Sequence, residues 1–347
     1  MSDKELQVKE LWVKDSTYDF KQWEQLLLAS DLKPGEPVDS VYGWFDGDQL
    51  VASGALFENI IKYLAIEPMY QGGSTFHQLL TTLTQALYRQ GETKVFVYTK
   101  PEHRQRFEAL NFTVIAQTTA VCFLEKGTPT LSDYLATIPV KTAQGTAGAI
   151  VMNANPLTWG HRYLVEQASR LCDQLYLFVV STDRSLFTTA ERIALVKNGV
   201  SDLANVSVYE SGDYMVSTKT FPSYFLKGNQ DKVAVQAQLD ATLFAEKIAP
   251  ALHITQRFVG SEPYSNTTAC YNQQLKATMN GKVRVNEIPR KSSSDGQPIS
   301  ASRVRTAILQ EDWALVTRLV PQSTADYIWS HRQSLRQRQQ EMKAENG

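Results

Sequence analysis

The second half of the sequence alternates short apolar runs with longer amphipathic stretches. The apolar runs predict buried strands, and the amphipathic stretches predict helices. The predicted strands are 148–152, 174–180, 206–210, 254–260 and 282–288, and the predicted helices are 161–172, 188–199, 231–249, 267–279 and several from about 300 onward. Strict strand–helix alternation requires right-handed crossovers, which give a parallel sheet covered by helices on both faces. We therefore predict an α/β Rossmann-like domain whose ligands bind beyond the carboxyl ends of the strands.

The first half is organised differently. Residues 40–57 predict two strands joined by a hairpin at Asp46-Gly47-Asp48, and 74–91 predicts an amphipathic helix that ends at Gly91. A strand, a helix and a pair of strands then follow up to residue 126, which indicates an α+β domain with largely adjacent strands. We expect a first domain over 1–126, a connector over 127–146 and a second domain over 147–347.

Charge and composition exclude several classes of protein. The 35 Lys and Arg residues nearly balance the 36 Asp and Glu residues, so no global basic excess exists to hold nucleic acid or an anionic membrane. The N-terminus lacks an apolar signal core, and the apolar runs are too short to span a bilayer. The three cysteines lie far apart, which is typical of reduced packing residues rather than a zinc site. We expect a cytoplasmic protein with no structural metal.

The first candidate site follows the first strand of the second domain. Thr158-Trp159-Gly160-His161 stands where that strand has ended and helix 161–172 begins. Free backbone N–H groups and the positive end of the helix dipole make such a position suitable for an anion. Gly160 permits close approach, and the imidazole of His161 can donate to a phosphate oxygen, with Thr158 as orienter or second donor. The alternative is that His161 only caps the helix.

A second candidate site lies 140 residues further along, at another predicted helix start. Ile299-Ser300-Ala301-Ser302 opens this helix, and Arg305 stands one turn inside it. Two hydroxyls, free amides and a guanidinium then meet at one place, a combination suited to an oxyanion. The alternative is an N-cap serine beside a solvated arginine.

Together these segments resemble the (H/T)xGH and ISxxxxR motifs of the nucleotidyltransferase superfamily. The resemblance implies that His161 contacts ATP phosphates and that the second helix start holds the β- and γ-phosphates. The implied catalytic residues are His161, Thr158 and Arg305, and the implied ATP-binding residues are Asn153, Gly160, His161, Glu262, Ser300, Ser302 and Arg305. Asn153 replaces a threonine common in the family, and Glu262 either meets the nucleoside or caps helix 267–279. Arg184 and Lys227 are further candidates for an anionic substrate, while Thr188 and Glu191 predict a capping box.

Residues 40–115 resemble the GNAT acetyltransferase fold. The segments "YLAIEPMYQGGSTFHQLLTTLTQALYRQG" and "HRQRFEALNF" carry this resemblance. The family's pyrophosphate loop matches Gln71–Phe76, where Ser74 and Phe76 replace glycine or small residues. Three interpretations stay open: a structural module, a docking surface for a carrier's pantetheine-like arm, and a live acetyltransferase.

Over nearly its whole length the chain resembles the citrate lyase ligase family. The segments "MNANPLTWGHRYLVEQA", "TFPSYFLK" and "GSEPYSNTTACYN" carry the likeness. It implies an AMP-forming acid–thiol ligase that uses ATP with Mg²⁺ to activate acetate. The acceptor would be the phosphoribosyl-dephospho-CoA thiol of the citrate lyase acyl carrier subunit. The alternatives are a phosphopantetheine-type adenylyltransferase and a non-catalytic nucleotide or acyl-CoA sensor.

Overall fold

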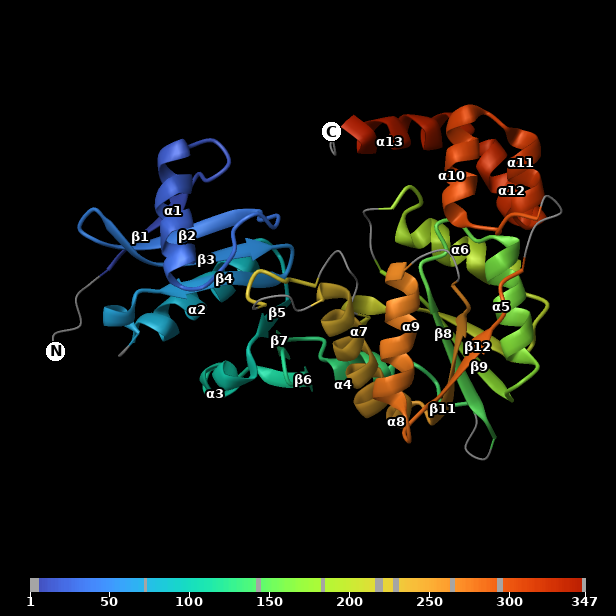
Figure 1. Ribbon diagram of the computed structural model, residues 1–347, viewed down its shortest axis with the longest axis horizontal. Helices are drawn as coiled ribbons and strands as arrows, with labels where there is room; N and C mark the ends of the chain where they lie inside the picture. The colour runs from blue at the N-terminus through green and yellow to red at the C-terminus, as the bar shows by residue number, and fades with distance from the viewer. Residues whose placement is uncertain are drawn as a thin grey trace. The chain divides into compact units, whose positions relative to one another are not determined.

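The chain folds into two compact units. The computed structural model describes residues 6–71, 74–141, 145–181, 185–215, 221–226, 231–262, 266–291 and 296–344, without the side chains of 343 and 344. Unit 1 comprises 1–136 with 218–243, and unit 2 comprises 137–217 with 244–347 (Figure 1). We expected 218–243 in the second domain, but the structure groups this segment with unit 1. One reason is that α7 (Lys232–Leu243) packs on strand β6 (Thr113–Gln117).

Unit 1 is built on a mostly antiparallel sheet in the order β1-β2-β3-β4-β5-β7-β6. Its other strands are β1 (Gln7–Leu11), β2 (Ser40–Asp46), β3 (Gln49–Phe57), β4 (Ile60–Ile66), β5 (Lys94–Thr99) and β7 (Cys122–Gly127). Its other helices are α1 (Thr17–Ala29), α2 (Thr75–Arg89), α3 (Arg104–Glu108) and α4 (Leu131–Ala136). The predicted hairpin and amphipathic helix are confirmed, and the leucines of α2 pack into the core beside β3.

The one parallel pair in this sheet is short. β4 and β5 are paired only at Ile60–Phe96 and Ile61–Val97. A cavity of about 220 Å³ is lined by residues 64–66 of β4, 97–99 of β5 and the aromatic pair Tyr224 and Phe225. Gly72 and Gly73 of the predicted pyrophosphate loop lie outside the described residues, so the three interpretations of this domain stay predictions.

Unit 2 contains the predicted parallel sheet, in the order β10-β9-β8-β11-β12. Its strands are β8 (Ala147–Met152), β9 (Gln174–Val179), β10 (Val206–Glu210), β11 (Ile254–Gly260) and β12 (Arg284–Ile288). In the sheet, β9 and β10 follow on one side of β8, and β11 and β12 follow on its other side. The direction therefore reverses between β8 and β11, and open α/β sheets bind ligands beyond the carboxyl ends of the strands at such a reversal.

Helices cover this sheet as the alternation predicts. α5 (Trp159–Ser169), α6 (Thr189–Gly199) and α9 (Asn266–Met279) follow β8, β9 and β11, and α5 and α9 flank the strands in Figure 1. The predicted helix 231–249 is instead α7, a π-helical turn (Phe244–Ile248) and the short α8 (Ala249–Ala251). The last helices are α10 (Ala301–Gln310), α11 (Trp313–Leu319), α12 (Gln322–Ser330) and α13 (Arg332–Ala344), with α12 packed on α6.

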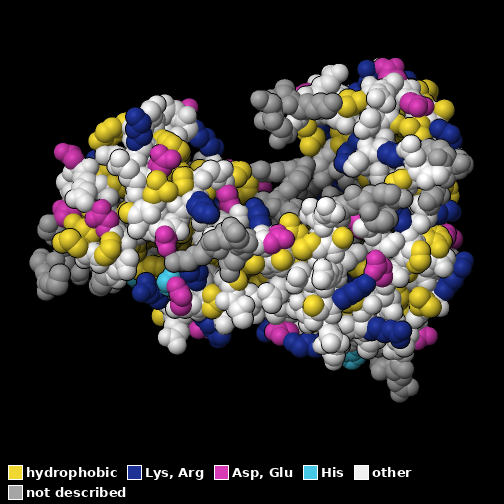
Figure 2. Space-filling view, in the orientation of Figure 1, with side chains coloured by type: hydrophobic (Ala, Val, Ile, Leu, Met, Phe, Trp, Pro, Cys, Tyr) yellow, Lys and Arg dark blue, Asp and Glu magenta, His cyan; other side chains and the backbone are white. Residues whose placement is uncertain are grey.

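The visible surface carries both signs of charge. Lys and Arg side chains are interspersed with Asp and Glu on the faces seen in Figure 2, in keeping with the formal net charge of −1. Within the described ranges, we find no helix with the length and apolar character needed to cross a bilayer.

Candidate functional site

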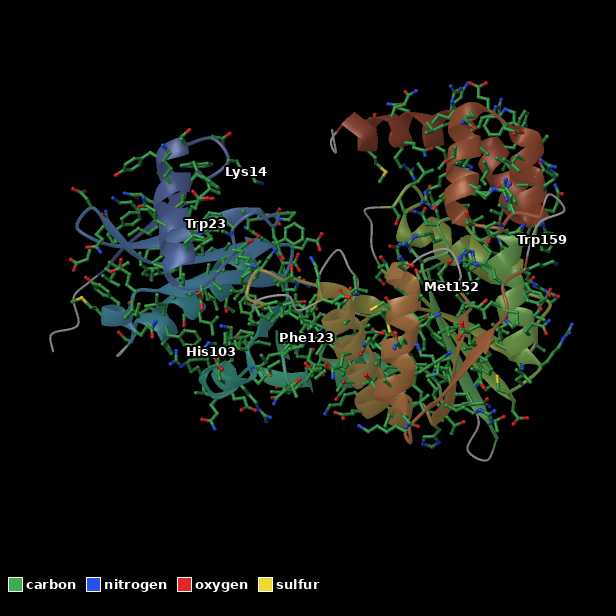
Figure 3. All side chains as sticks on the ribbon, viewed as in Figure 1. Lys14, Trp23, His103, Phe123, Met152 and Trp159 are labelled. Atoms are coloured by element: carbon green, nitrogen blue, oxygen red, sulfur yellow. The ribbon has the colours of Figure 1, made fainter. Side chains whose placement is uncertain are left out.

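The loop after β8 leads directly into a reciprocally capped helix. Thr158 is the N-cap of α5, and its hydroxyl accepts a hydrogen bond from the backbone N–H of His161 at 3.3 Å. In return, the backbone N–H of Thr158 donates to Nδ1 of His161 at 3.1 Å. His161 therefore does cap the helix, as one of the two interpretations held. Trp159, the first residue of α5, remains 38% exposed (Figure 3).

Capping decides which nitrogen of His161 carries the proton. Because Nδ1 accepts a backbone N–H, the neutral ring carries its proton on Nε2. Burial, with a contribution from the nearby charge of Arg290, lowers the pKa of His161 to about 4. The imidazole is thus neutral at physiological pH, and no hydrogen bond joins Nε2 to another described residue. Its Nε2–H can therefore donate a hydrogen bond to an acceptor oxygen.

The two predicted motifs lie against each other. A Cβ atom added at Gly160 would stand 3.1 Å from the carbonyl oxygen of Ile299 and 3.6 Å from the Cβ of Ile299. Any larger residue at 160 would therefore separate the start of α5 from the segment that enters α10. The glycine permits this close contact, which brings the start of α10 to the loop that follows β8.

In the second motif, Ser300 caps α10 and Arg305 binds the loop after β8. The Ser300 hydroxyl accepts the backbone N–H of Arg303 at 3.3 Å and so caps α10. Arg305 donates to the carbonyl oxygen of Asn155 at 2.7 Å and to the Ser302 hydroxyl at 3.1 Å. Burial lowers the pKa of Arg305 from its usual value. The guanidinium has five N–H donors and uses two of them for these hydrogen bonds, so the others can bind an oxyanion.

A buried arginine fixes the backbone around the site. Arg192 is fully buried in α6 and donates to both the carbonyl and the side-chain oxygen of Asn153, at 3.0 and 2.9 Å. It also donates to the carbonyl oxygens of Val180 (2.6 Å) and Phe187 (3.1 Å). The Oδ1 of Asn153, which we predicted to meet ATP, is thus already occupied by Arg192. Arg192 ties the end of β9 to the loop that follows β8.

An ion pair stands beyond the ends of β11 and β12. Glu262, predicted to meet the nucleoside or to cap a helix, is bonded by both guanidinium nitrogens of Arg290, at 2.7 and 3.1 Å. The Glu262 side chain is 8% exposed and that of Arg290 is 32% exposed. Arg184 and Lys227 lie outside the described residues, so their predicted roles stay predictions.

Comparison with known proteins places this site in a family. The model of the citrate lyase ligase C-terminal domain matches residues 147–328, more than half of the chain. The [citrate [pro-3S]-lyase] ligase of Haemophilus influenzae is 40% identical over 314 residues, which cover 88% of this chain and 93% of that protein. The Klebsiella pneumoniae ligase of the same name is 39% identical over 81% of this chain and 84% of that protein. The chain belongs to the citrate lyase ligase family.

Similarity to another class of enzyme is more limited. The phosphopantetheine adenylyltransferase of Dehalococcoides mccartyi is 40% identical over 65 residues, which cover 18% of this chain and 41% of that protein. The citrate lyase ligases match nearly the whole chain, unit 1 included, and the adenylyltransferase does not. The ligase interpretation is therefore favoured over a phosphopantetheine-type adenylyltransferase, and the resemblance to the citrate lyase ligase family is confirmed.

Sequence reasoning missed two arginines of the citrate lyase ligase site. Arg192 stands in an amphipathic helix, where a charged residue normally predicts a solvent-facing position. Arg290 follows β12 by two residues, just as Glu262 follows β11 by two residues, and Gly260 pairs with Ile288 in the parallel register. The pair could have been predicted from sequence, because two residues of opposite charge stand at the same distance beyond the ends of two adjacent parallel strands.

Proposed function

We propose that this chain is an ATP-dependent ligase that acetylates the citrate lyase acyl carrier subunit. It forms acetyl-adenylate from acetate and ATP, then transfers the acetyl group to the thiol of the phosphoribosyl-dephospho-CoA group on that subunit. Membership of the citrate lyase ligase family supports the identity of the reaction. In the structure, the contact of Gly160 with Ile299 supports it most, because it brings two helix N-termini to one edge of one sheet.

The first step is nucleotidyl transfer. A carboxylate oxygen of acetate attacks the α-phosphorus of ATP, the bond between that phosphorus and the bridging oxygen breaks, and pyrophosphate leaves. In this proposal the Nε2–H of His161 donates to an α- or β-phosphate oxygen, where negative charge accumulates. Ser302, Arg305 and the free N–H groups at the start of α10 hold the departing pyrophosphate. Positioning and charge stabilisation carry such a step.

Mg²⁺ enters the proposal bound to the nucleotide. Across the described ranges there is no group of three or more His, Cys, Asp or Glu side chains able to hold a metal ion. Phosphate oxygens and water suit Mg²⁺, which commonly takes only one or two protein carboxylates. The ion neutralises charge on the phosphates, while the residues of this chain orient the α-phosphorus toward acetate.

The second step transfers the acetyl group directly. The carrier thiolate attacks the acyl carbon of acetyl-adenylate, and the bond to the phosphate oxygen breaks to release AMP. Cys122 and Cys172 are buried, and burial raises the pKa of each thiol to about 11. Thiols of that pKa are protonated at neutral pH and poorly nucleophilic, so we assign neither of them a relay function.

Isotope exchange between ATP and pyrophosphate tests the first step. Acetate-dependent exchange is the expected result. Exchange that requires a phosphorylated pantetheine instead would establish the adenylyltransferase alternative, and nucleotide binding without any exchange would establish the sensor.

Recovery of citrate cleavage tests the second step. Deacetylated citrate lyase is incubated with this chain, ATP, Mg²⁺ and acetate, and citrate cleavage should return only when all are present. Acetate-dependent exchange without recovery of cleavage would retain the adenylation step and overturn the proposed acceptor.

A further inference from the structure

The backbone beyond β11 and β12 places Glu262 and Arg290 side by side. Gly260 and Ile288 are opposite each other in the parallel register, and each strand continues two residues to a charged side chain. The backbone N–H of Ser261 donates to the carbonyl oxygen of Ile288 at 2.9 Å, and that of Arg290 donates to the Ser261 hydroxyl at 3.0 Å. These bonds extend the strand pairing past the sheet, so the position of the ion pair is set by the backbone.

Glu262 holds the guanidinium from one side. Two N–H groups of Arg290 bind its carboxylate, at 2.7 and 3.1 Å, and a guanidinium has five such groups. Bidentate pairing fixes the plane of the guanidinium as well as its distance from the carboxylate. The Glu262 side chain is nearly buried while about one-third of the Arg290 side chain is exposed, so a ligand can reach the arginine although its partner is enclosed.

The segment that carries Arg290 lies near the start of α5. The charge of Arg290 reaches the imidazole of His161, where it contributes to the low pKa of that ring. The next residue, Lys291, has its ammonium 5.7 Å from the ring centre of Tyr163, which is in the first turns of α5. β11 also lies directly beside β8 in the sheet. The ion pair therefore lies at the same carboxyl edge of the sheet as His161, on the side toward β12.

This arrangement supplies what His161 lacks. A neutral imidazole offers one N–H but no positive charge, while attack on the α-phosphorus places further negative charge on its oxygens. Arg305 provides a cation from the first turns of α10, where it also binds the carbonyl oxygen of Asn155. Arg290, beyond β12, provides a second positive charge whose field reaches the imidazole.

We infer that Arg290 is a phosphate-binding residue of the adenylation site and that Glu262 is its positioning residue. The inference rests on the proposed adenylation of acetate, and it gives Glu262 a role different from the nucleoside contact predicted from sequence. Arg290 binds an α-phosphate oxygen beside the Nε2–H of His161. Glu262 acts through the guanidinium that it holds in place.

Four variants of the full-length protein test this inference. In acetate-dependent ATP–pyrophosphate exchange, Arg290→Gln should lower the rate by roughly 10²-fold or more, as loss of a preorganised charge-stabilising donor does. Arg290→Lys should restore only part of it, because an ammonium cannot replace the two-pronged geometry. Glu262→Gln should give an intermediate loss. Lys282→Gln is the matched control, since Lys282 pairs with Glu246 at 2.7 Å and precedes β12 at the opposite end of the strand.

The titration of His161 separates this role from a merely structural one. The chain has five histidines, and the His161 signal is assigned by its loss in His161→Gln. Removing the neighbouring positive charge in Arg290→Gln should raise the pKa of His161 above about 4, whereas Lys282→Gln should leave it there. An unchanged His161 titration in Arg290→Gln, or exchange within about threefold of the unmodified protein, would overturn the inference.

Calorimetry with ATP and Mg²⁺ alone measures ATP binding, and so tests the role of Arg290 separately from the proposed ligase reaction. A Kd for ATP raised about tenfold or more in Arg290→Gln, but not in Lys282→Gln, would support the phosphate role whatever the acid substrate is. An equal Kd in the two variants would count against it. A lack of acetate-dependent exchange in the unmodified protein, with this difference in Kd retained, would overturn the proposed function and leave the binding role of Arg290 intact.

Discussion

Replacement of Gly160 by alanine separates the site geometry from overall stability. In a helix, Ala is favoured over Gly by up to about 1 kcal/mol. The added methyl would lie 3.1 Å from the carbonyl oxygen of Ile299, so this backbone must retreat by a few tenths of an ångström. Overpacking of this kind costs about 1–3 kcal/mol. The two effects largely offset each other, and the free energy of unfolding should fall by no more than about 2 kcal/mol.

Activity should respond more strongly than stability to this replacement. A misplacement of about 1 Å can slow an enzyme 10²-fold, so a shift of a few tenths should slow adenylate formation by roughly 10-fold. Acetate-dependent ATP–pyrophosphate exchange measures this rate, and urea unfolding measures the stability. Gly260→Ala is the matched control, because nothing lies within 4 Å of a Cβ added there at the end of β11. Equal exchange rates in Gly160→Ala and Gly260→Ala would refute the idea that the two helix starts act together.

Three further predictions concern His161 and Arg192. His161→Ala should lower acetate-dependent exchange by roughly 10²-fold or more, and near-normal exchange would remove His161 from the mechanism. The pKa of His161 is about 6.5 in the unfolded chain and about 4 in the folded protein. As the pH falls from 6.5 toward 4, the unfolded chain binds the proton first, so the free energy of unfolding declines across this window. Thermal unfolding at pH 7 and pH 5 should show this decline, and a His161→Gln variant should show less of it. Arg192→Met should reduce the free energy of unfolding by roughly 3 kcal/mol or more, because several buried carbonyls lose their donor. The exposed Arg170→Met is its control, expected to stay within about 0.5 kcal/mol of the unmodified protein.

Local patterns were sufficient for most of unit 2. Alternating apolar and amphipathic segments depend only on neighbours in sequence, and they predicted that β8, β9, β10, β11 and β12 form a parallel sheet, though not their order in it. The same periodicity defines the buried face of a helix and does not define its first residue. Helix 161–172 was accordingly predicted two residues late, since α5 starts at Trp159 under the Thr158 cap.

Tertiary contacts determined what the patterns could not predict. α7 is buried along most of its length, so its sequence carries no preference for the sheet of unit 1 over that of unit 2. The sequence pattern also did not reveal the π-helical turn that interrupts the predicted helix 231–249. Arg192 is buried because carbonyls from three separate segments converge on it, and no short stretch of sequence contains that information.

Capping at the two helix starts is compatible with the ligand binding proposed there. Each helix start leaves several backbone N–H groups without an intrahelical acceptor, and one hydroxyl satisfies one of them. Thr158 and Ser300 take that role in α5 and α10, which leaves the neighbouring N–H groups for an anion. The cap of α5 has a further consequence, because the backbone bond to Nδ1 places the proton of His161 on Nε2. The two interpretations of His161, helix cap and phosphate donor, are therefore compatible, and the first prepares the second.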